Sequence, residues 1–194
     1  MKDNGLLVQY FTANTTDSQD LWKKAAEDAA VLKKMGATAV WFPPATKGAQ
    51  GKEDMGYAPY DLYDLGEFDQ KGSVGTRYGT KDEYIAAIKA MKDQGINVYA
   101  DIAVRQKLGA DRIEKVTAAD FNTKDIPQMI GNKKTVGALS KFTFPGRKSK
   151  YSKFKWNWKH FAGIDWKQEE FKKRVCALEG KDYDEADKKY SKYD

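Results

Sequence analysis

Hydrophobic and polar positions along the first hundred residues alternate between two kinds of pattern. Three short segments are apolar almost throughout, at residues 6–11, 38–42 and 96–104, which is typical of buried strands. Between them lie two segments of helical periodicity, over about residues 19–35 and from Thr80 to Gly95. Buried strands that alternate with amphipathic helices predict β-α-β units and a parallel sheet covered by helices.

Capping residues mark the ends of both predicted helices. Residues 15–18 read Thr-Thr-Asp-Ser and supply N-cap candidates for the first helix, which Gly36 is placed to end. Thr80 and Glu83 form a capping box at the start of the second helix. The spacing predicts the buried stripes Leu21, Ala25, Ala29 and Leu32 in the first helix and Ile85, Ile88 and Met91 in the second.

The pattern changes after residue 104. The rest of the chain shows short β-like runs at residues 116–121, 141–144 and 174–178, separated by polar turns and without a strong amphipathic helix. We therefore expect residues 1–104 to form three β/α units and residues 105–194 to form a β-rich, basic subdomain.

Composition narrows the class of protein. The 194 residues are 41% hydrophobic and 32% charged, which is typical of globular proteins and excludes a disordered chain. No apolar run approaches the ~20 residues that span a bilayer, so we expect no membrane partner. The start of the chain lacks the hydrophobic region of a signal peptide, so we expect a cytoplasmic protein or a mature chain from which a signal was removed.

The formal net charge of +6 belongs entirely to residues 141–194, because the first 140 residues are balanced in charge. Residues 142–161 interleave aromatic and basic side chains, a mixture that can stack bases and neutralise phosphates. The change from a balanced first part to a basic last part of the chain is typical of a separate subdomain or of a segment that contacts a partner.

Several runs of residues are recognisable in co-linear order. They lie at residues 8–11, 38–44, 56–68, 78–81, 95–101, 144–147 and 151–158, and the run at 56–68 reads Gly-Tyr-Ala-Pro-Tyr-Asp-Leu-Tyr-Asp-Leu-Gly-Glu-Phe. Together they resemble the bacterial liquefying α-amylases of glycoside hydrolase family 13 over nearly the whole chain. Most of the aromatic residues at 142–161 match positions that build an inserted domain in that family, which favours a structural role and no nucleic-acid partner.

The resemblance implies an α/β fold. The expected architecture is a partial (β/α)8 TIM barrel, with the first three β/α units followed by an inserted, mostly-β subdomain after the third strand. A complete barrel of this kind takes ~250 residues. The chain therefore matches the N-terminal portion of such an enzyme.

The implied activity is the hydrolysis of internal α-1,4 bonds in starch or glycogen with retention of configuration. Retaining glycosidases need two carboxyl groups about 5–5.5 Å apart. In this family the catalytic carboxylates follow later barrel strands, and no residue of this sequence matches them. We therefore predict no catalytic residue in this chain and no hydrolysis by the chain alone.

Three residues are implied to contact an α-glucan such as starch, glycogen or a maltooligosaccharide. Tyr57 matches a tyrosine that stacks on the sugar beside the cleaved bond, and Tyr10 and Asp101 are further candidates. Asp101 ends the third strand, where carboxylates of such barrels are functional. The competing interpretations are an ordinary loop tyrosine for Tyr57 and a helix or loop cap for Asp101. Gln106 stands where the family has a sugar-contacting His.

Calcium is the cofactor that the family implies. Asp165 and Asp194 match aspartates that share a metal cluster in calcium-dependent members. Arg105 stands where the family has a calcium-binding Asn. Calcium prefers neutral or anionic oxygen ligands, whereas a guanidinium offers none and repels the ion. The sequence therefore argues against the family's calcium site in this chain.

An alternative function remains open beside the enzyme fragment. The chain could be a non-catalytic module that contacts glucan weakly or pairs with a complementary half-barrel on another chain. Retained sugar binding without hydrolysis would be the signature of such a module.

Overall fold

The computed structural model describes residues 5–12, 15, 18–122, 128–167 and 172–180. The chain divides into two compact units. Unit 1 comprises residues 1–109 and 144–153, and unit 2 comprises residues 110–143 and 154–194. We expected one boundary after residue 104, whereas the chain passes between the units three times.

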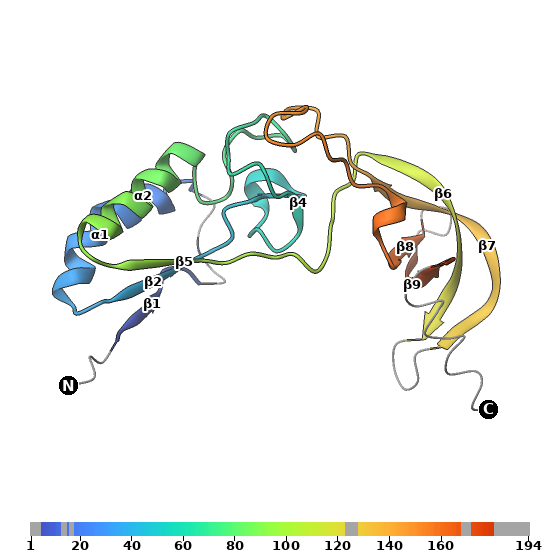
Figure 1. The fold of residues 1–194 in the computed structure, drawn as a ribbon, viewed down its shortest axis with the longest axis horizontal. Coiled ribbons are helices and arrows are strands. Elements are labelled where there is room, and N and C mark those ends of the chain that lie inside the picture. The colour runs from blue at the N-terminus through green and yellow to red at the C-terminus, as the bar shows by residue number, and fades with distance from the viewer. Residues whose placement is uncertain (1–4, 13–14, 16–17, 123–127, 168–171, 181–194) are drawn as a thin grey trace. The chain divides into compact units, whose positions relative to one another are not determined.

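Unit 1 is built on a three-stranded parallel sheet in the order β1-β2-β5 (Figure 1). The strands are β1 (Leu7–Gln9), β2 (Ala39–Phe42) and β5 (Asn97–Ala100), and two helices connect them, α1 (Leu21–Lys34) and α2 (Lys81–Asp93). Within the described residues no α-helix follows β5. The element order confirms the predicted β-α-β alternation.

The two helices cover one face of the sheet through a single hydrophobic core. Val8, Val40 and Val98 are neighbours in register and all pack into this core. Ala25, Ala29 and Leu32 are buried as predicted, and Met91 is buried on α2. Ile85 was predicted to be buried and is exposed instead, because the buried stripe of α2 runs through Tyr84 and Ala87.

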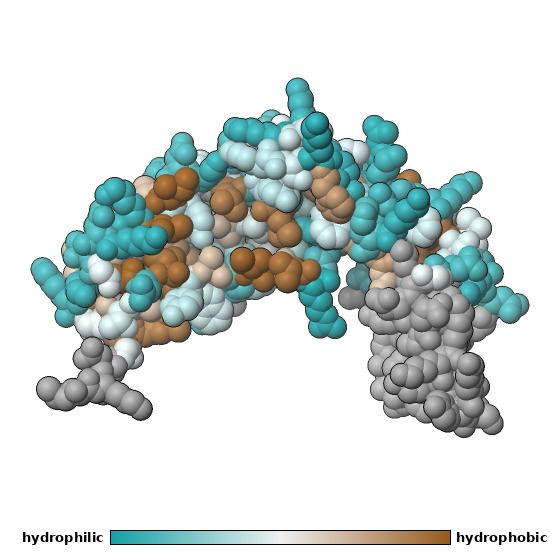
Figure 2. All heavy atoms as spheres, viewed as in Figure 1, coloured by the Kyte–Doolittle hydropathy of each residue, from teal (hydrophilic) through white to brown (hydrophobic). Residues whose placement is uncertain are grey.

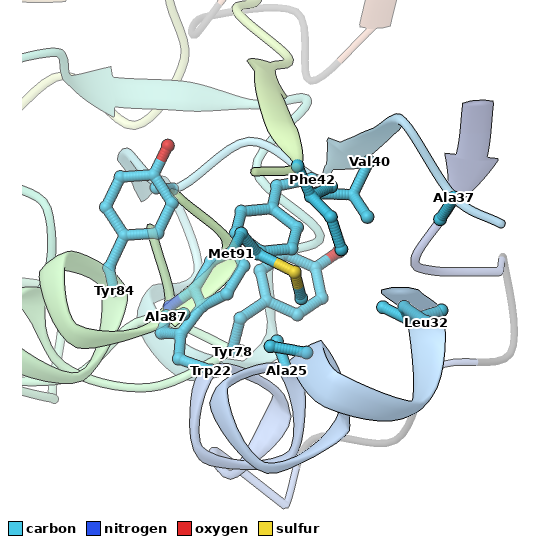
Figure 3. Close-up of a cluster of buried hydrophobic side chains, with 13 residues drawn as sticks. Trp22, Ala25, Leu32, Ala37, Val40, Phe42, Tyr78, Tyr84, Ala87 and Met91 are labelled. Atoms are coloured by element: carbon cyan, nitrogen blue, oxygen red, sulfur yellow. The ribbon is translucent and has the colours of Figure 1, made fainter. Parts of the chain in front are cut away.

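The centre of this core is an aromatic cluster that the helical spacing did not single out (Figure 3). Trp22 is fully buried, and its ring centroid lies 5.3 Å from that of Phe42, 5.6 Å from that of Tyr78 and 4.7 Å from that of Tyr84. Leu21, the residue predicted for this stripe, is only partly buried. The aromatic rings therefore join α1, β2, α2 and the loop before α2.

The helix ends show one confirmed prediction and one error. The capping box of α2 is present, with the Thr80 N–H donating to Glu83 Oε2 at 2.8 Å and the Glu83 N–H donating to Thr80 Oγ1 at 3.4 Å. The N-cap of α1 is Asp20 rather than a residue of 15–18, of which 16 and 17 lie outside the described residues. The Asp20 carboxylate pairs with Lys24 one turn later at 2.7 Å.

The third predicted strand is shorter than its apolar run. Pairing with β2 ends at Phe42, whose carbonyl accepts the Asp101 N–H at 3.1 Å. Pro43 and Pro44 directly follow strand β2, and neither has an N–H that could continue the hydrogen bonds between the strands. Beyond Asp101 the apolar side chains are therefore left exposed, and Val104 is 69% exposed.

Unit 2 contains the mostly-β structure expected after the third strand. Its antiparallel sheet has the strand order β7-β6-β9-β8. The strands are β6 (Arg112–Asn122), β7 (Gln128–Lys141), β8 (Gly163–Lys167) and β9 (Lys172–Leu178). A short 3-10 helix, η2 (Trp158–His160), lies between β7 and β8 in the chain. A small core of buried residues fills one face: Val116, Ala118, Val136, Ala138, Cys176 and Leu178. The run 141–144 is not a strand, because β7 ends at Lys141 and Phe144 has a φ of +51°.

The long loop between β2 and α2 carries short elements of its own, β3 (Lys47–Gly48), η1 (Gly51–Glu53) and β4 (Pro59–Asp61). Its interior holds Lys47, whose side chain is fully buried. The Lys47 ammonium donates to the carbonyls of Ser73 and Val74, both at 2.6 Å, and lies 3.7 Å from the Asp64 carboxylate. Burial lowers the pKa of Lys47, and the charge of Asp64 opposes that effect.

Residues 144–153 belong to unit 1 because a buried arginine joins them to this loop. Arg147 Nε donates to Asp61 Oδ2 at 2.7 Å, and both side chains are buried. Its Nη1 donates to the carbonyls of Lys150 at 2.7 Å and Ser152 at 2.9 Å. Gln70 Nε2 completes the network by donating to Asp61 at 3.1 Å and to Asp64 at 2.9 Å.

A second, more exposed group of charges lies on the same segment. Glu67 accepts hydrogen bonds from Lys150, Lys81 and the Tyr151 hydroxyl. These three donors, Lys150 first, lower the pKa of Glu67 to about 2. The segment is thus held to the loop and to the first turn of α2.

We predict that Arg147→Met destabilises unit 1 by about 3–5 kcal/mol, because removing one partner leaves the Asp61 carboxylate buried without its counter-charge. Urea unfolding followed by tryptophan fluorescence measures the change. Lys153→Met is the matched control, since it removes an exposed cation of the same segment. Equal unfolding midpoints for the two variants would contradict the prediction.

Candidate functional site

Tyr57 and Asp101, two of the predicted sugar-contacting residues, lie side by side in unit 1. The Tyr57 hydroxyl donates to Asp101 Oδ2 at 2.7 Å. Asp101 directly follows β5, at the carboxyl end of the parallel sheet, where functional groups of this kind of fold gather. Tyr57 is 40% exposed, so its ring remains accessible while its hydroxyl is held.

The turn that carries Tyr57 is fixed by the residues before it. Asp54 is buried, and its Oδ1 accepts the N–H of Gly56 at 2.8 Å and that of Ala58 at 3.4 Å. Gly56 has a φ of +90°, and a Cβ there would lie 2.6 Å from the Cβ of Pro44. Only glycine fits this position, so the turn aims Tyr57 in one direction.

Gln106 supplies a contact that the sequence did not predict. Its side-chain Nε2 donates to the main-chain carbonyl of Tyr57 at 2.8 Å. The departure from the family pattern at this position was visible in the sequence. The direction of the amide was not, because it depends on how the chain runs after β5.

Burial and the neighbouring carboxylate shape the electrostatics of the site. Partial burial raises the pKa of Tyr57 above its ordinary value, and the hydrogen bond to Asp101 raises it further. Burial likewise raises the pKa of Tyr78 to about 12, and the Tyr78 hydroxyl donates to the Met55 carbonyl at 3.1 Å. Both phenols are therefore neutral hydrogen-bond donors throughout the ordinary pH range.

Tyr10, the third predicted contact, makes its hydrogen bond elsewhere. Its hydroxyl donates to Asp28 of α1 at 2.6 Å, and its ring packs edge-on against Phe42 with centroids 6.0 Å apart. Burial and this bond raise the pKa of Tyr10. The structure thus places the Tyr10 hydroxyl against helix α1, whereas Tyr57 and Asp101 contact each other. Its role with glucan stays a prediction.

The implied calcium ligands do not come together in the described part of the chain. Asp165 is exposed on β8, and Asp194 lies outside the described residues. Among the residues that the structure describes, no group of three or more His, Cys, Asp or Glu side chains could hold a metal ion. Arg105 is exposed and provides no oxygen ligand. At the described positions, Asp165 and Arg105 therefore do not supply the set of oxygen ligands that calcium prefers.

Tyr57 and Asp101 together offer an exposed aromatic face beside a carboxylate. An accessible aromatic face can stack on the apolar face of a glucose ring, and the Asp101 carboxylate can accept hydroxyl protons beside it. Asp54, the nearest other carboxylate along the turn, is already committed to backbone N–H groups. An aromatic face beside a carboxylate is suited to contacting and orienting a polar ligand.

Comparison with known proteins identifies relatives over most of the chain. It is 46% identical to an alpha-amylase of Bacillus licheniformis over 181 residues, which are 93% of this chain and 35% of that protein. It is 46% identical to an alpha-amylase of Geobacillus stearothermophilus over 91% of this chain and 32% of that enzyme. A cytoplasmic alpha-amylase of Escherichia coli is 42% identical over 84% of this chain and 33% of its own length. The chain spans about a third of the length of these relatives.

Solved structures support the fold. An alternansucrase in complex with isomaltotriose matches with a TM-score of 0.57 and 21% identity, over 76% of this chain and 14% of that one. This likeness bears on the fold alone. No family model matches the sequence. Among the described residues, no helix is both long and apolar enough to cross a membrane.

We predict that calcium does not stabilise this chain, because Arg105 places a cation where the family has a neutral ligand. Thermal unfolding by circular dichroism, with calcium and with a chelator, measures the effect. The unaltered chain is expected to have equal melting temperatures in calcium and in chelator. Arg105→Asn, which restores the family's residue, is the variant for comparison. A higher melting temperature of the unaltered chain in calcium would contradict the argument.

Proposed function

Because this chain is homologous to bacterial α-amylases and corresponds to an N-terminal portion of them, we propose that it is the glucan-contacting front part of an α-amylase-type glycoside hydrolase. Its substrate class is the α-1,4-glucans, and the catalytic carboxylates would come from later barrel strands. Calcium has no part in this proposal. The proposal also includes a cytoplasmic location, because the Escherichia coli relative is named a cytoplasmic alpha-amylase.

The observation that carries the proposal is the Tyr57–Asp101 pair. The hydrogen bond of 2.7 Å holds the phenol, and the ring stays 40% exposed beside a carboxylate at the end of β5. In this proposal Tyr57 stacks on one glucose ring, and Asp101 orients both the tyrosine and the sugar hydroxyls. Because one side of the sugar is contacted, the expected affinity is weak. The isolated chain is expected not to hydrolyse the glucan, because no residue of the sequence matches the family's two catalytic carboxylates.

We predict that the chain binds maltohexaose and that Tyr57→Ala weakens this binding by about fivefold or more, since an aromatic contact contributes about 1 kcal/mol. Titration followed by NMR chemical shifts measures the affinity. Tyr63→Ala is the matched control, because Tyr63 is an exposed tyrosine of the same loop. Reducing-sugar release from starch by the purified chain would contradict the proposed lack of hydrolysis.

The second candidate function is a partner for a complementary half-barrel. It is favoured by the face of the sheet that the helices do not cover, where Gln9, Trp41 and Tyr99 lie in register. Tyr99 is 60% exposed, and Leu7 on the same face is 54% exposed. Hydrophobic residues also reach the surface elsewhere on unit 1 (Figure 2). Exposed apolar patches of this kind mark interaction sites.

This candidate predicts that the chain restores starch hydrolysis when mixed with the remaining two-thirds of the Bacillus licheniformis α-amylase. That enzyme is a suitable source because it is 46% identical to this chain over the matched region. Tyr99→Asp would place a charge on the uncovered face and abolish the restoration. Co-elution of the two chains without hydrolysis would contradict completion of a catalytic barrel.

A further inference from the structure

The segment after β5 holds Tyr57 at two separate points. Asp101 accepts its phenol at 2.7 Å, and Gln106 donates to its main-chain carbonyl at 2.8 Å. One contact fixes the far end of the side chain and the other fixes the peptide from which it projects. A ring held at both ends keeps one orientation, which lowers the ordering cost of stacking on a ligand.

The Gln106 contact is not duplicated by the turn on the other side of Tyr57. Asp54 Oδ1 accepts the Gly56 N–H at 2.8 Å, which fixes the peptide between Met55 and Gly56. Its bond to the Ala58 N–H is long, at 3.4 Å, and the Ala58 carbonyl is held by the Ala49 N–H at 2.8 Å. The peptide between Tyr57 and Ala58 therefore depends on Gln106 for its strongest polar contact.

We propose that Gln106 is a positioning residue for the glucan site: its amide fixes the Tyr57 peptide so that the exposed ring is presented to a glucose unit. This rests on the proposed function, and it specifies how the site is kept in order. The resemblance implied a sugar-contacting His at this position. In this chain the side-chain amide of Gln106 donates instead to the main-chain carbonyl of Tyr57. Gln106 therefore acts on the sugar indirectly, by positioning Tyr57.

The test is the full chain carrying Gln106→Ala. Amide hydrogen exchange is expected to accelerate at Tyr57 and Ala58, with little change in α1, α2 and the sheet. Affinity for maltohexaose is expected to fall about fivefold, because ordering the Tyr57 ring on binding then costs about 1 kcal/mol. The melting temperature is expected to change little, because Gln106 is exposed. Gln106→His, which retains a ring N–H donor, is expected to recover part of both effects.

Arg105→Ala is the matched control, because it truncates the exposed neighbouring residue. Unchanged exchange at Tyr57 and Ala58 in Gln106→Ala would overturn the proposal, as would faster exchange throughout unit 1, which would indicate a general structural role. If the unaltered chain does not bind maltohexaose, the proposed function fails and the glucan part of this inference fails with it. The exchange measurement would then still decide whether Gln106 holds the Tyr57 peptide.

Discussion

The buried charges that hold the long loop between β2 and α2 are the constraint on which unit 1 depends. Lys47 and Arg147 are fully buried cations, and Asp61 and Asp64 are the buried carboxylates that face them. A buried ion is costly unless it is paired and hydrogen-bonded, so the loop folds in a way that brings main-chain carbonyls to Lys47 and Arg147. A long connection between β2 and α2 thereby acquires one conformation without a large hydrophobic core of its own.

The conformation of that loop also positions the residues of the candidate site. Tyr57 lies between η1 and β4, and β4 ends at Asp61, the partner of Arg147. The conformation that places Tyr57 opposite Asp101 is thus anchored on one side by the charge network and on the other by the segment after β5. This explains why a turn of polar and small residues can present an aromatic ring in a fixed direction.

Much of unit 1 could be predicted from the sequence, because local signals there agree with the fold. Apolar runs predicted the three parallel strands, and Thr80 with Glu83 predicted the start of α2. The role of Trp22 at the core was missed, since Leu21 and Trp22 lie four and three residues before Ala25 and both spacings fit a helical stripe. Side-chain directions such as that of Gln106 were beyond reach, because they depend on contacts distant in sequence.

The assignment of residues 144–153 to unit 1 has a consequence for protein engineering. The chain leaves unit 1 after Gly109, returns at Phe144 and leaves again after Lys153. Unit 2 is therefore not a cassette with one entry and one exit. A graft that exchanged everything after the third strand would carry Arg147 away from Asp61 and exchange the network together with the subdomain. Recombination that respects the fold needs paired crossovers on both sides of that ten-residue return.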